Sequence, residues 1–430
     1  MKKLIVNGAE QLYGEVSAGG AKNAAVAIIP ATVLARGRCV LENVPDIHDT
    51  ELLFSMLRAM GATVEKLSRT SAIIDTSTLT ESTVPYELSK HMRASYYFIG
   101  SLLGRFGQAC VSMPGGCNFG VRPIDQHIKG FELLGAEIRI ENGLIYADTE
   151  GLQGAHIYFD QVSVGATINV MLAAVKASGM TVLENVAKEP HIVDLANFLN
   201  SMGADIRGAG TDVIKVHGVK QMHGCNYSII PDQIEAGSYM VAAAITKGDI
   251  TLHNVIPKHM EPITAKLRAA GCEVEEFDDA LRITRPGELK PLKLKTMPHP
   301  GFPTDMQPLM TALLTLAKGT SIVTEGIWEN RFRYVDELRR MGADISVDGK
   351  VAVVEGTGKL TGAPVKACDL RAGAALIIAG LAAHGVTEIE DIYHIERGYS
   401  NLDAKLREIG ADIVKVSEPS VQEKQLKEAL

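Results

Sequence analysis

The chain has 430 residues, too many for one ordinary hydrophobic core, so we expect two domains of roughly 200 residues each. Hydrophobic residues make up 46% of the chain and charged residues 22%, as in ordinary globular proteins and unlike disordered ones. The formal net charge of −8 argues against a general nucleic-acid binder, which would usually be basic.

The chain opens with a short strand at residues 3–6, whose apolar run is too brief for the core of a signal peptide. The longest apolar stretches, residues 24–35 and 372–383, are shorter than the roughly 18 residues that a membrane-spanning helix needs, so they are expected to be buried helices. The six cysteines form no CxxC pair and have no metal-spaced histidine nearby. We therefore expect a cytoplasmic protein with free thiols, no metal site and no membrane segment.

Six related units follow, and each contains a helix that ends in a glycine, then a small residue and a strand. Glycine just past a helix end accepts the positive φ of a C-cap. Each unit also has an alanine-rich first helix and a strand such as CVLENV or TVLENV, so its pattern is α-β-α-β-β. The repeated glycines lie roughly 70 residues apart and are Gly61, Gly135, Gly203, Gly271, Gly342 and Gly410.

Six units in a chain of this length divide into three plus three. We place the first three-unit domain at residues 22–229 and the second at residues 1–21 and 230–430. The opening strand is expected to join the C-terminal half, so that the chain would cross between the halves twice. The first helix of each unit is apolar nearly all round and should be buried, whereas the second is amphipathic and should lie outside. The alternative is an open solenoid scaffold, but the repeated unit is longer than is usual for the repeats of a solenoid.

Polar side chains recur at two positions of the units. At the start of the buried helices lie Lys22, Arg93, Ser163, Asp305 and Arg371, and before the outer helices lie Arg122, Arg331 and Arg397. Equivalent loops face the same end of a pseudo-symmetric domain, and helix N-termini favour anions. Arginine binds carboxylate and phosphate through two hydrogen bonds. The pattern predicts a pocket for a small anion with several charges, although any one arginine alone could be in a surface ion pair.

The segment SMPGGCNFGVRPIDQH, residues 112–127, is expected to be an irregular loop because of its glycines and its proline at position 114. Cys117 lies at its tip, where it cannot be buried in a core like an inert cysteine. A thiol near neutral pH can donate a proton, its thiolate can add to carbon, and Arg122 would lower its pKa.

In HPGFPTDMQ, Asp305 opens a helix and could be either an N-cap or a base near a reacting hydroxyl.

The motifs GGAKNAA, HMRAS, MPGGCNFGVRPID, SVGAT, FPTDMQ, ENRF, DLRAGAAL and YHIERGY occur in this order along essentially the whole chain. Together they resemble the UDP-N-acetylglucosamine 1-carboxyvinyltransferases, a family of enolpyruvyl transferases. The resemblance implies an α/β fold of two inside-out α/β barrels with six βαβαββ-type repeats, three per domain. It also implies transfer of the enolpyruvyl group of phosphoenolpyruvate to the 3-hydroxyl of UDP-N-acetylglucosamine, the first committed step of peptidoglycan precursor synthesis, without a cofactor.

The resemblance further implies the roles of individual residues. Cys117 would protonate the methylene carbon of phosphoenolpyruvate and be the target of fosfomycin, Asp305 would be the base, and Asp369 would lie at the active centre. The phosphoenolpyruvate site would contain Lys22, Asn23, Arg93, Arg122, Arg331, Arg371 and Arg397. The UDP-N-acetylglucosamine site would contain Asn23, Arg93, Arg122, Pro123, Ile124, Asp125, Gln126, Ser163, Val164, Gly165, Asp305 and Ile327.

Two positions depart from the pattern of some relatives: Gln161 stands where lysine is expected and Tyr97 where tryptophan is expected. Both affect details of binding on the uridine or sugar side and leave the type of reaction unchanged. The partners implied are these two small molecules, with no nucleic acid and no membrane. The oligomeric state stays open, with a monomer as the expectation.

Three alternatives remain at this point. The sister enzyme that acts on shikimate 3-phosphate shares fold and donor, but its GDKS-type and GNAGT-type motifs are absent from the sequence. A non-catalytic relative that binds a nucleotide sugar would not need Cys117, Asp305 and Arg397. A repeat scaffold without a ligand is the third.

Overall fold

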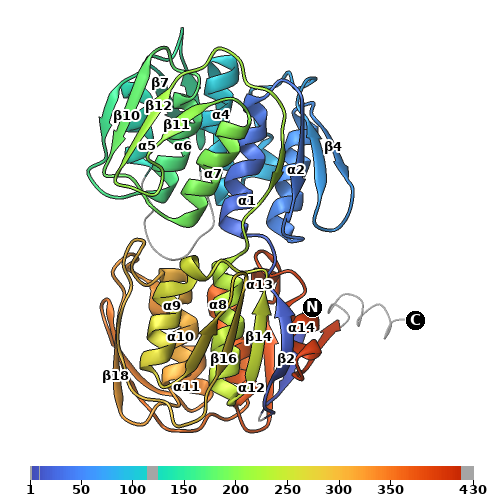
Figure 1. Cartoon of the computed structure of the whole chain (residues 1–430), viewed down its shortest axis with the longest axis vertical. Coiled ribbons are helices and arrows are strands. Elements are labelled where there is room, and N and C mark those ends of the chain that lie inside the picture. The colour runs from blue at the N-terminus through green and yellow to red at the C-terminus, as the bar shows by residue number, and fades with distance from the viewer. Residues whose placement is uncertain (1, 9, 114–123, 418–430) are drawn as a thin grey trace.

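The computed structural model describes residues 2–8, 10–113 and 124–417, and two lobes lie end to end along its long axis (Figure 1). Each lobe has its own hydrophobic core. One core gathers buried residues between Ala21 and Ile229, and the other gathers residues from Leu4 to Ala18 and from Ile234 to Ile413. The chain therefore begins in the second lobe, builds the first lobe and returns.

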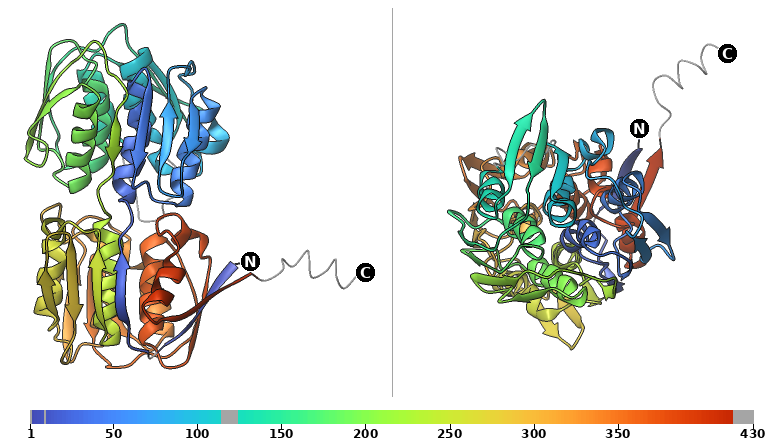
Figure 2. Two further views of the ribbon diagram at one scale, coloured as in Figure 1. Left: turned by 45° about the vertical axis from the view of Figure 1, so that its right-hand side comes forward. Right: turned by 90° about the horizontal axis from the view of Figure 1, so that it is seen from above.

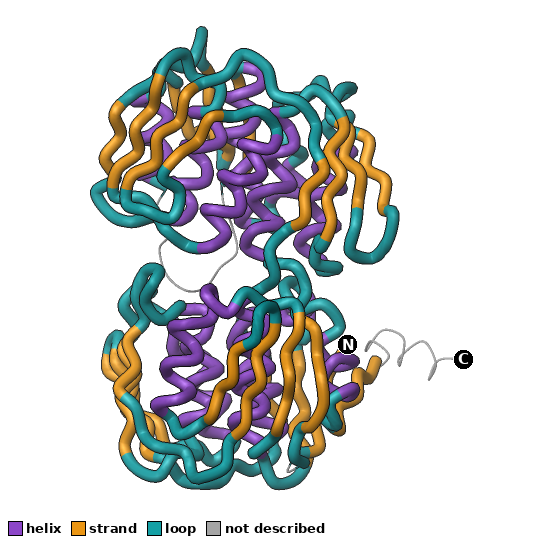
Figure 3. The backbone as a smooth tube through the Cα atoms, viewed as in Figure 1, coloured by secondary structure: helices purple, strands orange, loops and turns teal. Residues whose placement is uncertain are grey.

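The most buried helices run through the middle of each lobe, with the strands outside them (Figure 3). They are buried nearly all round because alanine, valine, isoleucine and leucine dominate them; α6, for example, buries every residue from Ala166 to Ala174. The inner helices are α1 (Lys22–Ala31), α4 (Tyr97–Phe106) and α6 (Val164–Ala174) in the first lobe, and α8 (Gln233–Thr246), α10 (Gln307–Leu314) and α12 (Leu370–Ala382) in the second.

A second helix of each unit buries only part of its surface. In α9 the buried residues are Met260, Ile263, Thr264 and Leu267, the spacing of one helical face. These outer helices are α2 (His48–Ala59), α5 (Asp125–Leu133), α7 (Pro190–Ser201), α9 (Pro257–Ala269), α11 (Val335–Arg340) and α14 (Leu402–Glu408). Short helical turns complete the helices: η1 (Thr32–Leu34), α3 (Tyr86–Ser89), η2 (Arg93–Tyr96), η3 (Thr304–Met306), η4 (Arg331–Tyr334) and α13 (Tyr393–Glu396).

The described residues form six small sheets, three in each lobe, which supports the division into six units. The first lobe has the sheets β13-β3-β5-β4, β6-β8-β7 and β11-β12-β10-β9. Their strands are β3 (Arg38–Glu42), β4 (Thr63–Lys66), β5 (Ala72–Asp75), β6 (Gln108–Ser112), β7 (Glu137–Glu141), β8 (Leu144–Asp148), β9 (His156–Tyr158), β10 (Met180–Glu184), β11 (Asp205–Arg207), β12 (Val213–His217) and β13 (Asn226–Ser228).

The second lobe has the sheets β15-β16-β14-β2, β17-β18-β20-β19 and β21-β22-β1-β23. Their strands are β1 (Lys2–Asn7), β2 (Tyr13–Ser17), β14 (Asp249–His253), β15 (Glu273–Glu276), β16 (Ala280–Thr284), β17 (Lys293–Lys295), β18 (Thr320–Thr324), β19 (Asp344–Asp348), β20 (Val351–Glu355), β21 (Pro364–Lys366), β22 (Val386–Glu390) and β23 (Asp412–Ser417). Strand β1 is antiparallel to both β22 and β23, which confirms the expected pairing of the opening strand with the C-terminal half.

The six repeated glycines all follow helices and all have φ between 88° and 99°. In this left-handed region a side chain would be strained, so glycine ends each helix before the next strand begins. The C-cap role predicted from the repeated phrase is confirmed.

Two strands are exchanged between the lobes at the points where the chain crosses. Strand β2 precedes α1 but pairs in parallel with β14 of the second lobe, and β13 precedes α8 but pairs in parallel with β3 of the first. The crossing segments lie side by side: the Ala21 amide donates to the Ile230 carbonyl at 2.8 Å, and the Asp232 amide donates to the Gly19 carbonyl at 2.8 Å. The left view of Figure 2 shows both segments passing between the lobes.

None of the helices in the described part of the chain is long and apolar enough to cross a membrane.

Candidate active site

The inner helices α1 and α8 both start on the crossing segments, so each begins at the end of its lobe that faces the other lobe. Asp232 joins the two starts. Its Oδ1 accepts hydrogen bonds from the amides of Ile234 and Glu235 at the N-terminus of α8, and its Oδ2 accepts one from the amide of Lys22 in the first lobe, at 3.0 Å. The N–H groups of helix starts favour anions, and here the Asp232 carboxylate accepts hydrogen bonds from both helix starts at the boundary between the lobes.

Asp49 connects cations from the two lobes. It lies at the start of α2, its side chain is 3% exposed, and its Oδ2 is 2.9 Å from Nζ of Lys22. From the second lobe, Nε of Arg397 donates to its Oδ1 at 2.9 Å. Burial pushes the pKa of Asp49 up, but Lys22 and Arg397 outweigh that effect and leave the pKa below its ordinary value.

The sequence interpretation missed Asp49. The signal was present, because Asp49 lies before or at the start of an outer helix, the position at which Arg331 and Arg397 were noted in later units.

Asp305 lies in η3, between two buried arginines of its own lobe. Nη2 of Arg331 donates to its Oδ1 at 3.4 Å, and Nε of Arg371 donates to its Oδ2 at 3.2 Å. Burial raises the pKa of Asp305, but Arg371, Arg331 and Lys22 lower it more, to about 2. The alternative role as an N-cap is wrong, because the carboxylate engages the arginines and caps no helix.

Arg371 has unused hydrogen-bonding capacity at this place. It is 3% exposed, and its guanidinium carbon lies 5.2 Å from the ring centre of Tyr399. Its Nη1 is buried and has no hydrogen-bond partner among the described residues. Leaving a buried charged donor unpaired is costly, so an anion that entered here would gain a preformed partner. The neighbouring Asp369 holds the start of α12 by accepting hydrogen bonds from the amides of Arg371 and Ala372, each at 2.9 Å.

A second group of predicted residues gathers at the starts of helices in the first lobe. The guanidinium of Arg93 lies 5.5 Å from the ring centre of Tyr96, and that ring packs edge-on against buried His127. Burial and then the charge of Arg93 lower the pKa of His127 to about 3. A Cβ on Gly165 would lie 2.5 Å from Oη of Tyr96, so the start of α6 approaches this ring as only glycine allows.

The remaining predicted residues lie around these groups. Ser163 caps α6 through the Ala166 amide at 3.2 Å and precedes Val164, Asp125 is the first residue of α5, and Gln126 binds Asp160 through both its side-chain oxygen and nitrogen. Ile124 is the N-cap residue of α5, and the Ile327 amide donates a hydrogen bond to Glu325. Of the two positions that depart from the pattern of some relatives, Tyr97 is buried against Tyr96 and Gln161 is exposed. Cys117, Arg122 and Pro123 lie outside the described residues.

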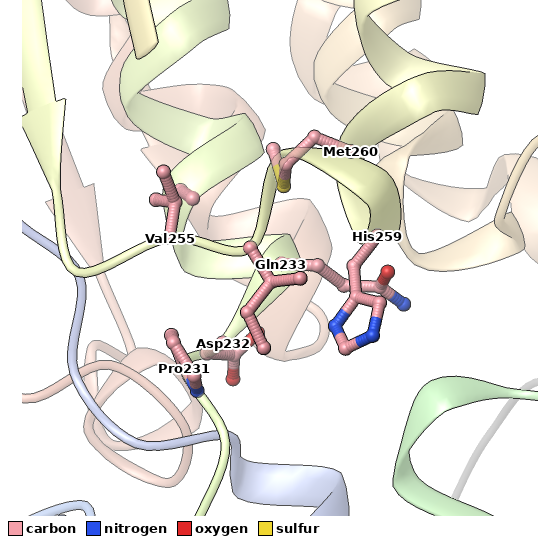
Figure 4. Close-up of a pocket in the computed structure, with 8 residues that line it drawn as sticks. Pro231, Asp232, Gln233, Val255, His259 and Met260 are labelled. Atoms are coloured by element: carbon pink, nitrogen blue, oxygen red, sulfur yellow. The ribbon is translucent and has the colours of Figure 1, made fainter. Parts of the chain in front are cut away.

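A pocket opens between the lobes beside Asp232. Its walls come from both lobes and are formed by Ala21, Asn23, Pro190, His191, Ile230, Pro231, Asp232, Gln233, Ile234 and His259. A second pocket shares Pro231, Asp232, Gln233 and His259 and continues toward Val255 and Met260 (Figure 4). The sequence interpretation identified Asn23 but missed His191, Asp232 and His259.

Within the described parts of the chain, no group of three or more histidine, cysteine or acidic side chains is arranged to hold a metal ion. The described residues between the lobes supply cations, carboxylates and imidazoles, which can bind an anion and transfer protons.

Comparison with known proteins identifies the family. Residues 6–406 match the model of a family described as EPSP synthase (3-phosphoshikimate 1-carboxyvinyltransferase). A UDP-N-acetylglucosamine 1-carboxyvinyltransferase 3 of Caldanaerobacter subterraneus is 58% identical over 97% of this chain and all of its own length. A UDP-N-acetylglucosamine 1-carboxyvinyltransferase of Clostridium botulinum is 56% identical over 97% of this chain and all of its own length. Among solved structures, the enolpyruvyl transferase NikO of Streptomyces tendae has a TM-score of 0.89 at 26% identity, covering 97% of this chain and 99% of its own.

Proposed function

The chain belongs to the family of UDP-N-acetylglucosamine 1-carboxyvinyltransferases, within the wider enolpyruvyl transferases, and we propose that it transfers the enolpyruvyl group of phosphoenolpyruvate to the 3-hydroxyl of UDP-N-acetylglucosamine. The reaction would release phosphate and would be the first committed step of peptidoglycan precursor synthesis in the cytoplasm. The observation that carries the proposal is the half-buried Asp305 carboxylate between the buried side chains of Arg331 and Arg371, together with the Lys22–Asp49–Arg397 bridge between the lobes.

Phosphoenolpyruvate carries a carboxylate and a phosphate, and the interlobe site offers cations for both. Lys22 of the first lobe and Arg397 of the second hold one carboxylate, that of Asp49, and so lie close enough to share an anion. Buried Arg371 has a free Nη1 among its described surroundings. In our proposal Lys22, Arg122 and Arg397 bind the donor, with Arg93, Arg331 and Arg371 adding positive charge around it.

The acceptor would occupy the neighbouring groups of side chains. Asn23 lines the interlobe pocket, and the nucleotide sugar would extend from it toward the starts of α5 and α6 in the first lobe. There Ile124, Asp125, Gln126, Ser163, Val164 and Gly165 would contact it, with Arg93, Arg122 and Pro123, and with Asp305 and Ile327 from the second lobe.

Chemistry would begin when the lobes close on both substrates and exclude water. Cys117 protonates the methylene carbon of the donor while the acceptor hydroxyl adds to the neighbouring carbon and gives up its proton toward Asp305. Addition gives a tetrahedral ketal. The thiolate then takes a proton back from the methyl group, the carbon–oxygen bond to phosphate breaks, and the enol ether remains on the sugar.

Domain closure in this proposal pivots on the two crossing segments, with residues 22–229 as one domain and residues 1–21 and 230–430 as the other. Two antiparallel segments hydrogen-bonded to each other give a narrow connection that can bend while both cores stay intact.

The test is a phosphate-release assay with phosphoenolpyruvate and three acceptor conditions: UDP-N-acetylglucosamine, shikimate 3-phosphate and none. Release that requires UDP-N-acetylglucosamine supports the proposal. Release that requires shikimate 3-phosphate would assign the sister reaction, and no release under any condition would favour a protein that only binds the nucleotide sugar.

A further inference from the structure

Glu325 is a buried acidic residue that the proposed mechanism does not use. It follows β18, it is 1% exposed, and both of its side-chain oxygens accept hydrogen bonds. Oε1 accepts from Oγ1 of Thr296 at 2.7 Å, and Oε2 accepts from Oγ1 of Thr304 at 3.0 Å. Oε1 also accepts from the amides of Ile327 and Trp328, at 2.8 and 3.1 Å. Four neutral donors on one buried side chain make a fixed centre, because each bond restricts it and a buried acceptor is costly to leave unpaired.

These donors belong to two segments of the second lobe. Residues 296–304 lead from β17 into η3, and residues 324–328 form the end of β18 and the loop after it. At one end the segments are joined directly, since the Thr296 amide donates to the Thr324 carbonyl at 3.0 Å and the Gly326 amide donates to Oγ1 of Thr296 at 2.8 Å. At the other end, where η3 begins, Thr304 reaches the second segment through Glu325.

The turn that begins at Thr304 carries Asp305. Turn η3 has three residues, and its N-cap residue is Pro303, whose side chain cannot accept a hydrogen bond. So short a turn holds its own position weakly. The two arginines do not fix Asp305 closely either, because their bonds to it, at 3.2 and 3.4 Å, are long for charged hydrogen bonds. The bond from Thr304 to Glu325 therefore bears on where the Asp305 carboxylate lies.

We propose that Glu325 is a positioning residue, which holds the turn of Asp305 at a fixed distance from the loop of Ile327. In the proposed function, on which this inference rests, Asp305 receives the proton of the acceptor hydroxyl and Ile327 contacts the nucleotide sugar. Glu325 thus aligns the base with the bound acceptor, through the Thr304 hydroxyl on one side and the Ile327 amide on the other. This alignment matters because a displacement of about 1 Å can lower a rate by roughly 10²-fold.

A pair of threonine variants tests the link to Asp305. Thr304→Val removes the hydroxyl but leaves the amides of Ile327 and Trp328 on Glu325, so kcat should fall by roughly 10–10²-fold with KM for both substrates within about threefold of wild type. Thr304→Ser returns the hydroxyl and should restore most of the lost turnover. The matched control is Thr320→Val, which removes another threonine–glutamate hydrogen bond of the same lobe, from Thr320 to exposed Glu355 at 2.8 Å, and should leave kcat unchanged.

Glu325→Ala tests the link to the acceptor. It removes both sides of the centre, so kcat should fall and KM for UDP-N-acetylglucosamine should rise by roughly tenfold, the size of one hydrogen bond. KM for phosphoenolpyruvate should stay within about threefold of wild type, because the donor is held elsewhere. Urea unfolding gives the folded fraction of each variant, since a role in stability alone would leave kcat per folded molecule unchanged. If Glu325→Ala does not fold, the threonine pair still decides.

The outcomes separate this inference from the proposed function. A kcat for Thr304→Val equal to that of Thr320→Val overturns the positioning role while the proposed function stands. So does a loss that Thr304→Ser fails to restore, or an unchanged KM for UDP-N-acetylglucosamine in folded Glu325→Ala. A wild-type chain without phosphate release overturns both.

Discussion

Replacing Asp305 with asparagine tests how the site holds its charges. The substitution keeps the shape of the side chain but removes the charge that Arg331 and Arg371 share, and both arginines are at most 3% exposed. The pKa of Asp305 is lowered from 3.8 to about 2, and a difference of that size corresponds to about 2 kcal/mol in favour of the ionised form. Asp305→Asn should therefore lower the free energy of unfolding by about 2 kcal/mol at neutral pH.

The matched control is Asp344→Asn, which changes an exposed aspartate on β19 of the same lobe and should alter stability by less than about 0.5 kcal/mol. Urea unfolding at a series of pH values supplies the measurement. Because the pKa of Asp305 is lower in the folded chain than in the unfolded chain, its contribution is complete above the unfolded value and is lost as the pH falls toward 2. The difference between wild type and Asp305→Asn should shrink accordingly as the buffer is acidified.

The same variant should lose turnover, because an amide cannot accept the hydroxyl proton. We expect phosphate release to fall by roughly 10²–10⁴-fold, the usual contribution of a placed acid–base group. Equal urea stability of Asp305→Asn and Asp344→Asn, together with wild-type turnover, would refute both the charge balance and the role of Asp305.

Three further predictions concern the donor, the thiol and the closure of the lobes. Arg397→Ala should weaken phosphoenolpyruvate binding by about 1.5–3 kcal/mol, the range for charged hydrogen bonds; unaltered affinity in calorimetric titration would place the donor elsewhere. Cys117→Ser should fold and lose most turnover because a serine hydroxyl is far less acidic, whereas Cys117→Asp should retain measurable activity with its optimum at lower pH and resist fosfomycin. Initial rates of both variants against pH, with and without fosfomycin, check these expectations. A serine variant as fast as wild type would show that the Cys117 thiol takes no part in the reaction. The radius of gyration from small-angle scattering should fall when UDP-N-acetylglucosamine and fosfomycin are added, and a constant radius would count against closure.

The repeated units could be predicted from the sequence because their signals are local. The glycines at 61, 135, 203, 271, 342 and 410 mark helix ends through their positive φ, and the apolar first helices show burial without any knowledge of their partners. The recurrence of polar residues at helix starts predicted a cluster of cations for an anion. In the structure Lys22 and Arg397 contact Asp49, and Arg331 and Arg371 contact Asp305.

The residues that were missed depend on contacts between the lobes. Asp49 and His191 lie at outer-helix starts, where an acidic or imidazole side chain usually meets solvent, and nothing local shows that the second lobe covers them. Strands β2 and β13 are exchanged between the lobes, and contacts across the same boundary join Arg397 to Asp49, Asp232 to Lys22, and Glu189 to His299. Strands as short as β2 and β13, with five and three residues, carry no sequence signal that identifies the strand they pair with. The sequence therefore predicted that the chain crosses twice between the lobes but not which strands pair after each crossing.

The product of the reaction tests the central claim most directly. The chain is incubated with phosphoenolpyruvate and UDP-N-acetylglucosamine, phosphate is measured, and the nucleotide sugar is analysed by mass spectrometry and nuclear magnetic resonance. We predict one phosphate for each nucleotide sugar that gains an enolpyruvyl ether at its 3-oxygen. Phosphate released without the ether, or a nucleotide sugar recovered unchanged, would contradict the assignment.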